Sequence, residues 1–343
     1  MVDARPTGKD VAELAGVSQS TVSRVLSGSG LDLISEQTIQ RVRKIASEVG
    51  YSPNPFARAL RGKQTYMLGI IVREIDDPFF ASLIGELSLQ AGALGYQVAL
   101  GPAHSDPMEA LQVAVVLDTR HMDGVIILGD QHDDDNAVLE IFKGHRAVVA
   151  MCRGSDPEGI STVNADNCRG IDLLLDHLTR LGHQSLAYID GGWLGDIRER
   201  RDHFQYGLHK RSLELRQDWV QVEANQAEGG YRAMERLLDL PDRPTAVLAS
   251  DDVMAIGALK AAIDRGISVP SELSLCGFDD IEMARYVHPA LTTMRQPVAE
   301  LSRQALRILV QNIESTTSGP VTGKLVRVLP ELVVRQSTGP RSG

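Results

Sequence analysis

From residue 66 onward, apolar runs alternate with helical stretches, and this alternation constrains the fold more than any other feature. The runs are MLGIIV, YQVALG, DGVIILG, RAVVAM, SLAYIDG, WVQV, TAVLAS and ELSLCGF. Segments of helical period, such as 79–94 and 253–265, lie between them. Strands this apolar, each followed by a crossover helix, are typical of parallel sheets covered on both faces. The runs are too many for one comfortable sheet, so residues 66–340 are predicted to form two α/β lobes.

Polar residues gather where these predicted strands end, in REIDDPFF, GDQHDDD, CRGSD, DGGWLGD, SDD and GFDD. Ligands of open α/β sheets bind beyond the carboxyl ends of the strands. The pattern therefore predicts a ligand cleft between the two lobes. We interpret the run from His132 to Asp135 as a solvated loop rather than a metal site, and we expect neither a metal nor a cofactor.

Residues 1–50 predict a separate head of three short helices. The first, 9–15, has Val11 and Leu14 facing inward and ends at Gly16. Ser18 is expected to cap a second helix whose apolar residues follow i, i+3, i+4 spacing. The third helix is expected from Ser35 to Val49. Two prolines follow in YSPNPFARALRGKQT, so residues 51–65 read as a hinge or linker.

Charge is divided unevenly between these parts. Residues 1–65 contain nine Lys or Arg and six acidic residues, a net +3, whereas the remainder carries -13 within a total of -10. A basic head on an acidic body suggests that the head meets a polyanion such as nucleic acid. No apolar run approaches the roughly 18 residues of a membrane span, so we expect a cytoplasmic protein. Cys152, Cys168 and Cys276 are widely spaced, which supports neither zinc nor a disulfide framework.

The stretch KDVAELAGVSQSTVSRVL fits a helix-turn-helix, in which a tight glycine turn joins two helices. The second helix would lie in the major groove, with Gln19 pairing with adenine and Arg24 with guanine. Thr21 and Ser23 would reach phosphates, and the rest of the expected DNA-contacting set on this helix is Ser18 and Ser20. An ordinary helical hairpin with a solvated polar face fits the period equally well.

The same stretch, followed by SEQTIQRVRKIASEVGYSPNPFARALRGKQT, resembles the head and hinge of the LacI/GalR family of bacterial transcriptional regulators. The resemblance continues through GIIVREIDDPFF, HMDGVIIL, SDDVMAIGALKAAIDRGISVP and ELSLCGFDDIEMARYVHPALTTMRQPV, so it covers nearly the whole chain. It implies a homodimeric or higher-order DNA-binding protein whose core is similar to periplasmic sugar-binding proteins.

The resemblance also implies roles for hinge residues. Leu60 matches the leucine that such regulators wedge into the minor groove, which partly unstacks a base step and bends the duplex. Asn54 belongs to the same DNA-contacting hinge. The alternative for Leu60 is packing against its own protein.

For the core, the resemblance implies a set of effector-binding residues: Asp77, Phe79, Arg153, Arg200, Asp251 and Asp279. Trp193 is added as a stacking face, because Asn225 stands where the family often has an aromatic ring, and packing is the alternative for Trp193. Arg200 fits an Arg-x-x-Gly-Phe pattern in which His203 replaces the glycine, and Asp251 falls where many members have Asn. A guanidinium with carboxylates suits a polyhydroxylated ligand, because one acceptor can bind neighbouring hydroxyls. The alternative is a set of solvated loop caps.

The sequence thus predicts a regulator, most simply a repressor, that binds a near-palindromic operator and is controlled by a sugar-like effector. A corepressor-dependent regulator that responds to a purine or another metabolite is an alternative, and a solute-binding protein is a more distant one. An enzyme is not expected, because the chain has no G-x-G-x-x-G after its first strand, no P-loop and no nucleophile elbow.

Overall fold

The chain divides into two compact units, residues 1–65 and 66–343. The computed structural model describes residues 6–27, 31–51, 64–103, 107–117, 121–129, 137–142, 145, 147–153, 159–192, 195–315 and 323–341. Within these ranges no helix combines the length and the apolar character that a membrane crossing needs.

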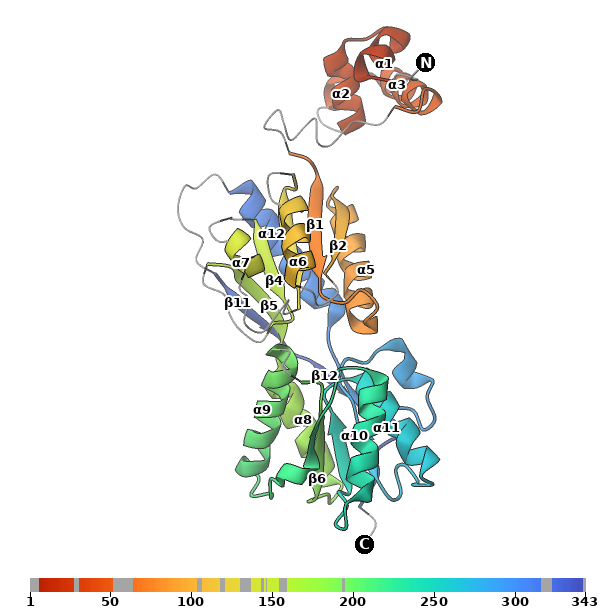
Figure 1. Cartoon of the computed structure of the whole chain (residues 1–343). Coiled ribbons are helices and arrows are strands. Elements are labelled where there is room, and N and C mark those ends of the chain that lie inside the picture. Colours follow the sequence, from red (N-terminus) through yellow and green to blue (C-terminus); the bar gives the residue numbers. More distant parts are fainter. Residues whose placement is uncertain are drawn as a thin grey trace. The chain divides into compact units, whose positions relative to one another are not determined.

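The first unit contains helices α1 (Gly8–Ala15), α2 (Gln19–Ser27) and α3 (Glu36–Glu48), with a 3-10 turn at Leu31–Leu33 (Figure 1). Thr7 and Asp10 cap α1 reciprocally, and Gly16 ends it at a φ of 62°, which favours glycine. Ser35 caps α3 by accepting a hydrogen bond from the Thr38 N–H. The predicted helices and their caps are therefore confirmed.

One core assignment in the head was wrong. Leu14 is 61% exposed, whereas Ala12 and Ala15 are buried beside Val11. Leu14 lies at i+3 and Ala15 at i+4 from Val11, so either residue can share the face of Val11, and the apolar pattern alone does not decide which one is buried. In the structure the face with Ala12 and Ala15 is buried, where α1 contacts α2 and α3.

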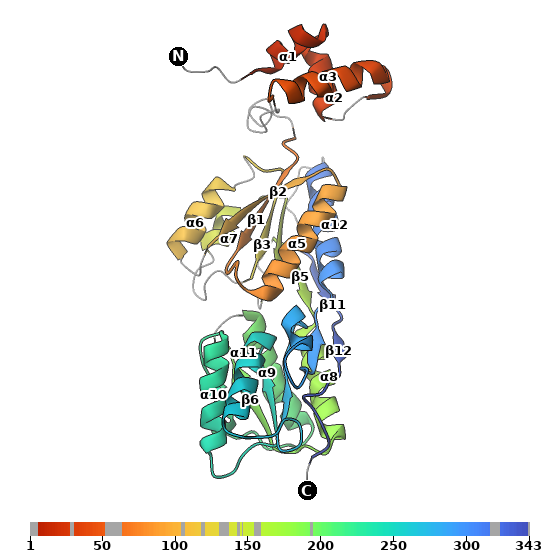
Figure 2. The same ribbon diagram turned by 90° about the vertical axis from the view of Figure 1, so that its right-hand side faces the viewer.

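The second unit has two lobes, each a parallel sheet covered by helices on both faces (Figures 1 and 2). The six-stranded sheet of the N lobe has the order β11-β5-β4-β3-β1-β2, and the four-stranded sheet of the C lobe has the order β7-β6-β8-β9. All neighbours within both sheets pair in parallel. The two-lobed α/β architecture predicted from the apolar runs is confirmed.

In the N lobe the elements are β1 (Met67–Val72), α5 (Pro78–Ala93), β2 (Gln97–Pro102), α6 (Pro107–Val116), β3 (Gly124–Leu128), α7 (Ala137–Phe142), β4 (Val148–Met151), β5 (Ser161–Ala165), α12 (Val298–Glu314) and β11 (Leu325–Val328). Alternate residues of β1 face opposite layers, because Cβ atoms alternate along a strand. Ile70 packs with α5 and α12, and Ile71 packs with α6 and α7. Figure 2 shows these helix pairs on opposite sides of the sheet.

In the C lobe the elements are α8 (Asn167–Arg180), β6 (Leu186–Asp190), α9 (Gly195–Lys210), a 3-10 turn (Gln217–Trp219), β7 (Val220–Val222), α10 (Ala227–Asp239), β8 (Ala246–Ala249), α11 (Asp252–Asp264), β9 (Ser274–Cys276), a 3-10 turn (Glu282–Arg285), β10 (Thr293–Arg295) and β12 (Glu331–Val333). Ile189 packs on the side of α10 and α11, while Tyr188 packs on the side of α8 and α9.

The chain passes between the lobes three times, from β5 to α8, from β10 to α12, and from β11 to β12. The sequence pattern missed this exchange, because residues 161–165 and everything after 293 were not recognised as strands and a returning helix. Strands β10 and β12 form a short antiparallel pair in the C lobe. The lobes are thus joined by three short connections.

Two single variants, Val11→Ala and Leu14→Ala, test which of these side chains belongs to the hydrophobic core of the head. Val11→Ala should lower the free energy of local unfolding by about 1.5–3 kcal/mol, because a fully buried side chain leaves a cavity. Leu14→Ala should change it by less than about 0.5 kcal/mol, as at other exposed positions. Hydrogen exchange of the head amides in the full-length protein measures both values. Equal losses would return Leu14 to the core.

Candidate functional site

The second helix of the head presents a polar face. Side chains of Ser18, Gln19, Ser20, Ser23 and Arg24 are exposed, and Thr21 is half-buried. Val22 and Val25 on the opposite face are buried in the core of the head. This separation is the one that a helix entering a DNA groove requires.

The Ser18 hydroxyl organises the start of α2. Ser18 Oγ accepts a hydrogen bond from the Thr21 N–H at 3.1 Å and lies 2.9 Å from Thr21 Oγ1. It also lies 2.7 Å from Ser20 Oγ. Ser18 therefore caps the helix, as the sequence predicts, and its hydroxyl is already engaged within the head. Three of the predicted site residues, Asn54, Leu60 and Trp193, lie outside the described residues, as do His132–Asp135.

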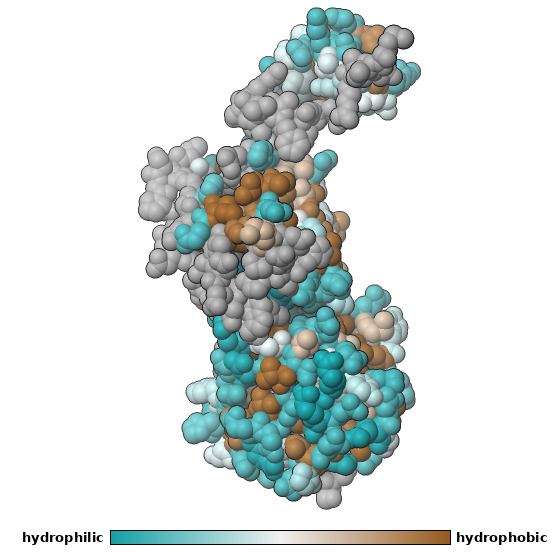
Figure 3. All heavy atoms as spheres, viewed as in Figure 1, coloured by the Kyte–Doolittle hydropathy of each residue, from teal (hydrophilic) through white to brown (hydrophobic). Residues whose placement is uncertain are grey.

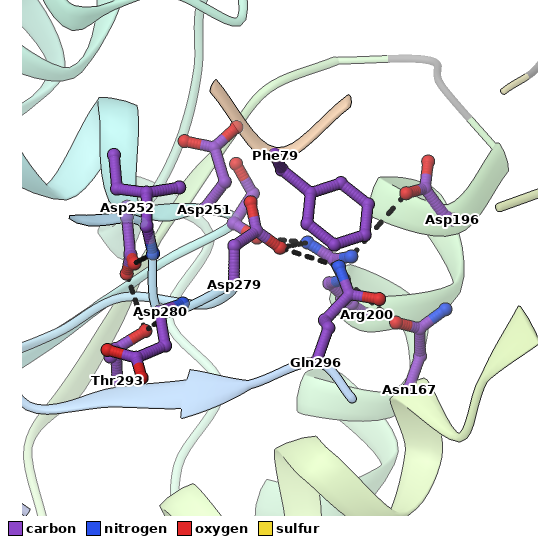
Figure 4. Close-up of polar contacts among 12 residues, drawn as sticks. Phe79, Asn167, Asp196, Arg200, Asp251, Asp252, Asp279, Asp280, Thr293 and Gln296 are labelled. Atoms are coloured by element: carbon purple, nitrogen blue, oxygen red, sulfur yellow. Dashed lines mark hydrogen bonds and ion pairs between the residues drawn. The ribbon is translucent and has the colours of Figure 1, made fainter. Parts of the chain in front are cut away.

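Arg200 of α9 lies at the centre of the polar residues where the lobes face each other (Figure 4). Its side chain is only 3% exposed. Nε donates to Asn167 Oδ1 at 2.9 Å and Nη1 donates to the Ser250 carbonyl at 2.7 Å, while the plane stacks on Phe278 with Cζ 3.9 Å from the ring centre. Asp196, one helical turn earlier, accepts from Nη2 at 3.4 Å. This network holds the guanidinium rigidly, because each of its three nitrogens has a hydrogen-bond acceptor.

Asp279 faces Arg200 from the loop after β9. Its Oδ1 lies 3.6 Å from Arg200 Nη1, longer than a hydrogen bond, and accepts from Gln296 Nε2 at 2.7 Å. Asp279 and Asp280 have φ values of 118° and 59°, which are strained for non-glycine residues. The Asp279 N–H donates to the Met294 carbonyl of β10, and Asp280 pairs with Arg295 and Arg335. The neighbouring β10 strand therefore holds the strained carboxylate in place.

Asp251 and Asp77 are both helix caps. Asp251 accepts from the Met254 N–H at the start of α11, and Asp77 accepts from the Phe79 and Phe80 N–H groups at the start of α5. Burial and the nearby charge of Asp251 raise the pKa of Asp77 to about 6, and burial also raises the pKa of Asp251. Asp77 belongs to the N lobe and Asp251 to the C lobe, and the effect of the Asp251 charge on Asp77 is consistent with strand edges that face each other.

Phe79 and Arg153 complete the predicted set from the N lobe. The Phe79 ring, 5% exposed, extends from α5 toward Arg200 (Figure 4). Arg153 follows β4, is 4% exposed, and donates from Nη1 to the Gly129 carbonyl at 3.3 Å. Asn164 of β5 holds the Arg153 backbone at both its N–H and its carbonyl. The structure thus brings together Asp77, Phe79, Arg200, Asp251 and Asp279, and places Arg153 at the facing edge of the N lobe.

Sequence reasoning missed several members of this network. Asn167 and Gln296 hold Arg200 and Asp279 from outside the polar runs at the predicted strand ends. Asp196 ends the run DGGWLGD, but the sequence pattern does not single it out as a site residue. Asp252 is fully buried behind the network, where it accepts from the Thr293 hydroxyl at 2.5 Å and from the Ile281 N–H at 2.9 Å. Burial raises the pKa of Asp252 to about 8. The sequence shows two adjacent acids, Asp251 and Asp252, as a signal of this site. Only the fold reveals that Asp251 caps α11 and that Asp252 is buried.

A hollow of about 340 Å³ lies on another face of α9, lined by Cys168, Gly195, Arg198, Glu199, Asp202, His203 and Tyr206. Arg200 is not among the lining residues, since it points inward with Phe204. His203, which replaces the glycine of the family pattern, pairs with Asp172 at 3.4 Å on this outer face. The replacement therefore leaves the surroundings of Arg200 intact.

Comparison with known proteins agrees with both parts of the chain. Residues 7–54 match bacterial regulatory proteins of the lacI family, and residues 175–338 match a periplasmic binding protein-like domain. The HTH-type transcriptional repressor CytR of Escherichia coli strain K12 is 34% identical over 342 residues, covering 97% of this chain and 96% of that protein.

Solved structures give the same result. The Lac repressor dimer bound to operator and the anti-inducer ONPF matches with a TM-score of 0.83 at 26% identity, covering 98% of this chain and all of that chain. The complex of the transcriptional regulator CelR with cellobiose matches with a TM-score of 0.72 at 28% identity, covering 97% of this chain and all of that chain.

The fold and its two polar surfaces therefore define a DNA-binding transcriptional regulator with a periplasmic-binding-protein-like core. The chain belongs to the lacI family of bacterial regulatory proteins. Its relatives are transcriptional repressors and not enzymes, which confirms the regulator predicted from the sequence.

Asp252→Asn tests the buried acid behind the network. The folded-state pKa of about 8 lies above the unfolded value, so the unfolded chain releases the proton first and wild-type stability falls as pH rises from 5 to 8. The asparagine variant lacks this titrating carboxyl, so its stability should decline less over the same range, by about 3–4 kcal/mol. Urea unfolding of both proteins at pH 5 and pH 8 measures the difference. Parallel pH profiles would mean that Asp252 is ionised in the folded protein.

Proposed function

We propose that the chain is a repressor that binds a near-palindromic operator as a homodimer and is controlled by a small polyhydroxylated effector held between its lobes. The observation that supports an effector site is the buried polar network around Arg200. Asp196 Oδ1 is buried there without a hydrogen-bond partner among the described residues. An acceptor left open in a buried site costs free energy unless a donor such as a ligand hydroxyl reaches it.

The chemistry of the network suits a sugar. Asp196, Asp251 and Asp279 supply acceptor oxygens around one guanidinium, an arrangement that matches vicinal hydroxyls. The Phe79 ring supplies an apolar face of the kind that packs on a sugar ring. The similar CelR regulator was solved with cellobiose, which supports the same class of ligand here.

The effector would act through the geometry of the lobes. Asp77 and Phe79 belong to one lobe and Arg200 and Asp279 to the other, so a ligand touching both favours one arrangement of the lobes over another. The three connections between the lobes allow such a rearrangement without breaking either sheet. The change in DNA affinity then equals the difference in ligand binding between the two arrangements.

On the DNA side, we assign base contacts to Gln19 and Arg24 and phosphate contacts to Thr21 and Ser23, with Ser18 and Ser20 at the start of the helix. The exposed polar face of α2 supports this assignment. Asn54 and Leu60 of the hinge, residues 51–65, would add contacts in the minor groove, with Leu60 as the wedge.

Exposed apolar side chains support self-association. Strand β2 is an edge of the N-lobe sheet, flanked by α5 and α6. Leu89, Leu100, Val115 and Val116 are exposed along these elements, and brown residues gather over α6 in Figure 3. An apolar edge of this kind is typical of a surface that a second copy covers.

A corepressor-dependent regulator of a purine or another metabolite is the second candidate. The Phe79 ring near the Arg200 guanidinium would also stack on a flat base. Melting temperature measured against sugars, polyols, sugar acids and nucleosides separates the two, because a ligand that binds only the folded state raises it. A solute-binding protein would show ligand binding without operator binding.

Arg24→Ala tests the groove-reading helix. The variant should lose on the order of 1–3 kcal/mol at the operator and little on random duplex, because a bidentate contact to guanine discriminates between bases. Lys44→Ala on α3 is the control, because it removes the same positive charge from a side chain that is 76% exposed. Fluorescence anisotropy with both duplexes measures the losses. An equal loss of Arg24→Ala on both would reduce Arg24 to a phosphate contact.

Asp279→Ala and Arg200→Ala test the effector site. Each should keep operator binding but remove the effect of the ligand on operator affinity, because the coupling depends on the groups that contact the ligand. Asp264→Ala, an exposed position on α11 that pairs with Lys260, is the matched control. Operator titrations with and without the best ligand, together with calorimetry, measure the coupling. Wild-type coupling in both site variants would place the effector elsewhere.

A further inference from the structure

Arg73 directly follows β1 and is buried without the hydrogen bonds that hold Arg200. The residue is 2% exposed, and its Nε and Nη1 atoms have no hydrogen-bond partner among the described residues. Arg200 is equally buried, but hydrogen bonds and two carboxylates surround it. An unpaired buried cation is costly, because the guanidinium loses its hydration without compensation.

A cation–π contact supports the Arg73 side chain and leaves its donors open. Cζ of Arg73 lies 5.2 Å from the centre of the Phe80 ring, a cation–π contact with the guanidinium. No carboxylate in the described parts of the chain forms an ion pair with it. The in-plane N–H groups are the ones that bind carboxylates and phosphates in a bidentate manner, and they are the groups left without partners.

A second guanidinium approaches the same place. Strands β4, β3 and β1 are neighbours, and Arg153, Gly129 and Arg73 follow their carboxyl ends. Arg153 Nη1 donates to the Gly129 carbonyl, and a Cβ atom at Gly129 would lie 3.3 Å from Arg73 Nη1 and 3.0 Å from the Phe80 ring. Gly129 also has a φ of 75°. Because Gly129 has no side chain, the Arg73 guanidinium has room there, and the Arg153 guanidinium lies beside the same glycine.

No acid of the network forms an ion pair with Arg73 among the described residues. Asp77, the acid at the start of α5, accepts from two backbone N–H groups, and the Arg73 charge acts on its pKa without a direct hydrogen bond between the two side chains. Asp279 and Asp196 pair with Arg200 instead. Arg73 nevertheless shares its surroundings with the C-lobe residues, since the charges of Arg73, Asp196, Arg200 and Asp279 all act on the buried Cys152 thiol, and those of Arg73 and Asp251 both act on Asp77. A ligand held where the strand ends face each other would lie near both groups of residues.

We propose that the effector carries a carboxylate or phosphate group, bound by the Arg73 guanidinium beside Arg153 at the strand ends of the N lobe. The hydroxyls of the same molecule bind Asp196, Arg200 and Asp279 in the C lobe. The ligand class is then an acidic sugar derivative, a sugar acid or a sugar phosphate. This inference rests on the proposed effector function of the network and adds the charge of the ligand.

Matched neutral and acidic compounds test the proposal in the full-length protein. The pairs are D-glucose against D-glucuronate and D-glucose 6-phosphate, D-ribose against D-ribose 5-phosphate, and inosine against inosine 5′-monophosphate, with inorganic phosphate alone as a further probe. At least one acidic compound should bind more tightly than its neutral partner by about 10- to 100-fold, the range expected for hydrogen bonds to a charged group. Melting curves find the pair, and calorimetry measures both affinities.

Arg73→Gln should remove this preference and bring the acidic compound to the affinity of its neutral partner, while Arg73→Lys should retain part of it. The unliganded Arg73→Gln protein should melt at the same temperature as wild type or higher, because an uncompensated buried charge is lost. Arg216→Gln is the matched control. Arg216 also stacks on an aromatic ring, Trp219, but pairs with Asp218 and Asp242 on the surface of the C lobe.

Two results would overturn the proposal. One is that no acidic compound binds better than its neutral partner in wild type. The other is that Arg73→Gln weakens both members of a pair by the same factor and lowers the melting temperature, which would make Arg73 a structural residue. Failure of this kind differs from failure of the effector site itself: if Asp279→Ala still abolishes binding of a neutral sugar, the proposed function stands and only the charge of the ligand is wrong.

Discussion

Parallel pairing is the constraint on which the rest of the core depends. When neighbouring strands run in the same direction, the loops after them emerge at one edge of the sheet, and the ligand groups described here come from such loops or from the helices that follow them. Arg73, Gly129 and Arg153 follow three adjacent strands of one lobe, and Asp251 and Asp279 follow two adjacent strands of the other. Two such edges facing each other bring together residues more than 200 positions apart in the chain.

The buried charges at this meeting place are tolerated unevenly. Arg200 is held by Asn167, a backbone carbonyl, an aromatic ring and two acids, so its burial is compensated within the protein. Arg73 and the Oδ1 atom of Asp196 are not compensated in the same way. Open donors on one lobe and an open acceptor on the other are what a polar ligand between the lobes would satisfy, and strain at Asp279 fits the same interpretation.

Much of the fold could be predicted from the sequence, because periodicity and caps are local. The three head helices, the glycine turn at Gly16 and most strands of the core follow from apolar spacing and cap residues. The prediction failed where local pattern is ambiguous. Leu14 and Ala15 lie on neighbouring stripes of α1, and only the contact with the other two helices decides which is buried. The strand at 161–165 contains polar residues, so its burial depends on neighbours that the sequence does not display.

The candidate site divides in the same way. The sequence by itself determined the class of the protein, because motifs along nearly the whole chain resemble one family. It also determined the exposed face of α2 and the strand ends and following helix that carry Asp77, Asp251, Asp279 and Arg200, because each depends on residues close together in the chain. Only the tertiary structure decided that α12 and β11 return to the first lobe, that Asp252 is a buried acid beside the cap Asp251, and that Arg73 lacks a partner. Pairing, burial and desolvation are properties of groups that meet in space, and side chains that meet here are brought together by sheets that form across the whole length of the core.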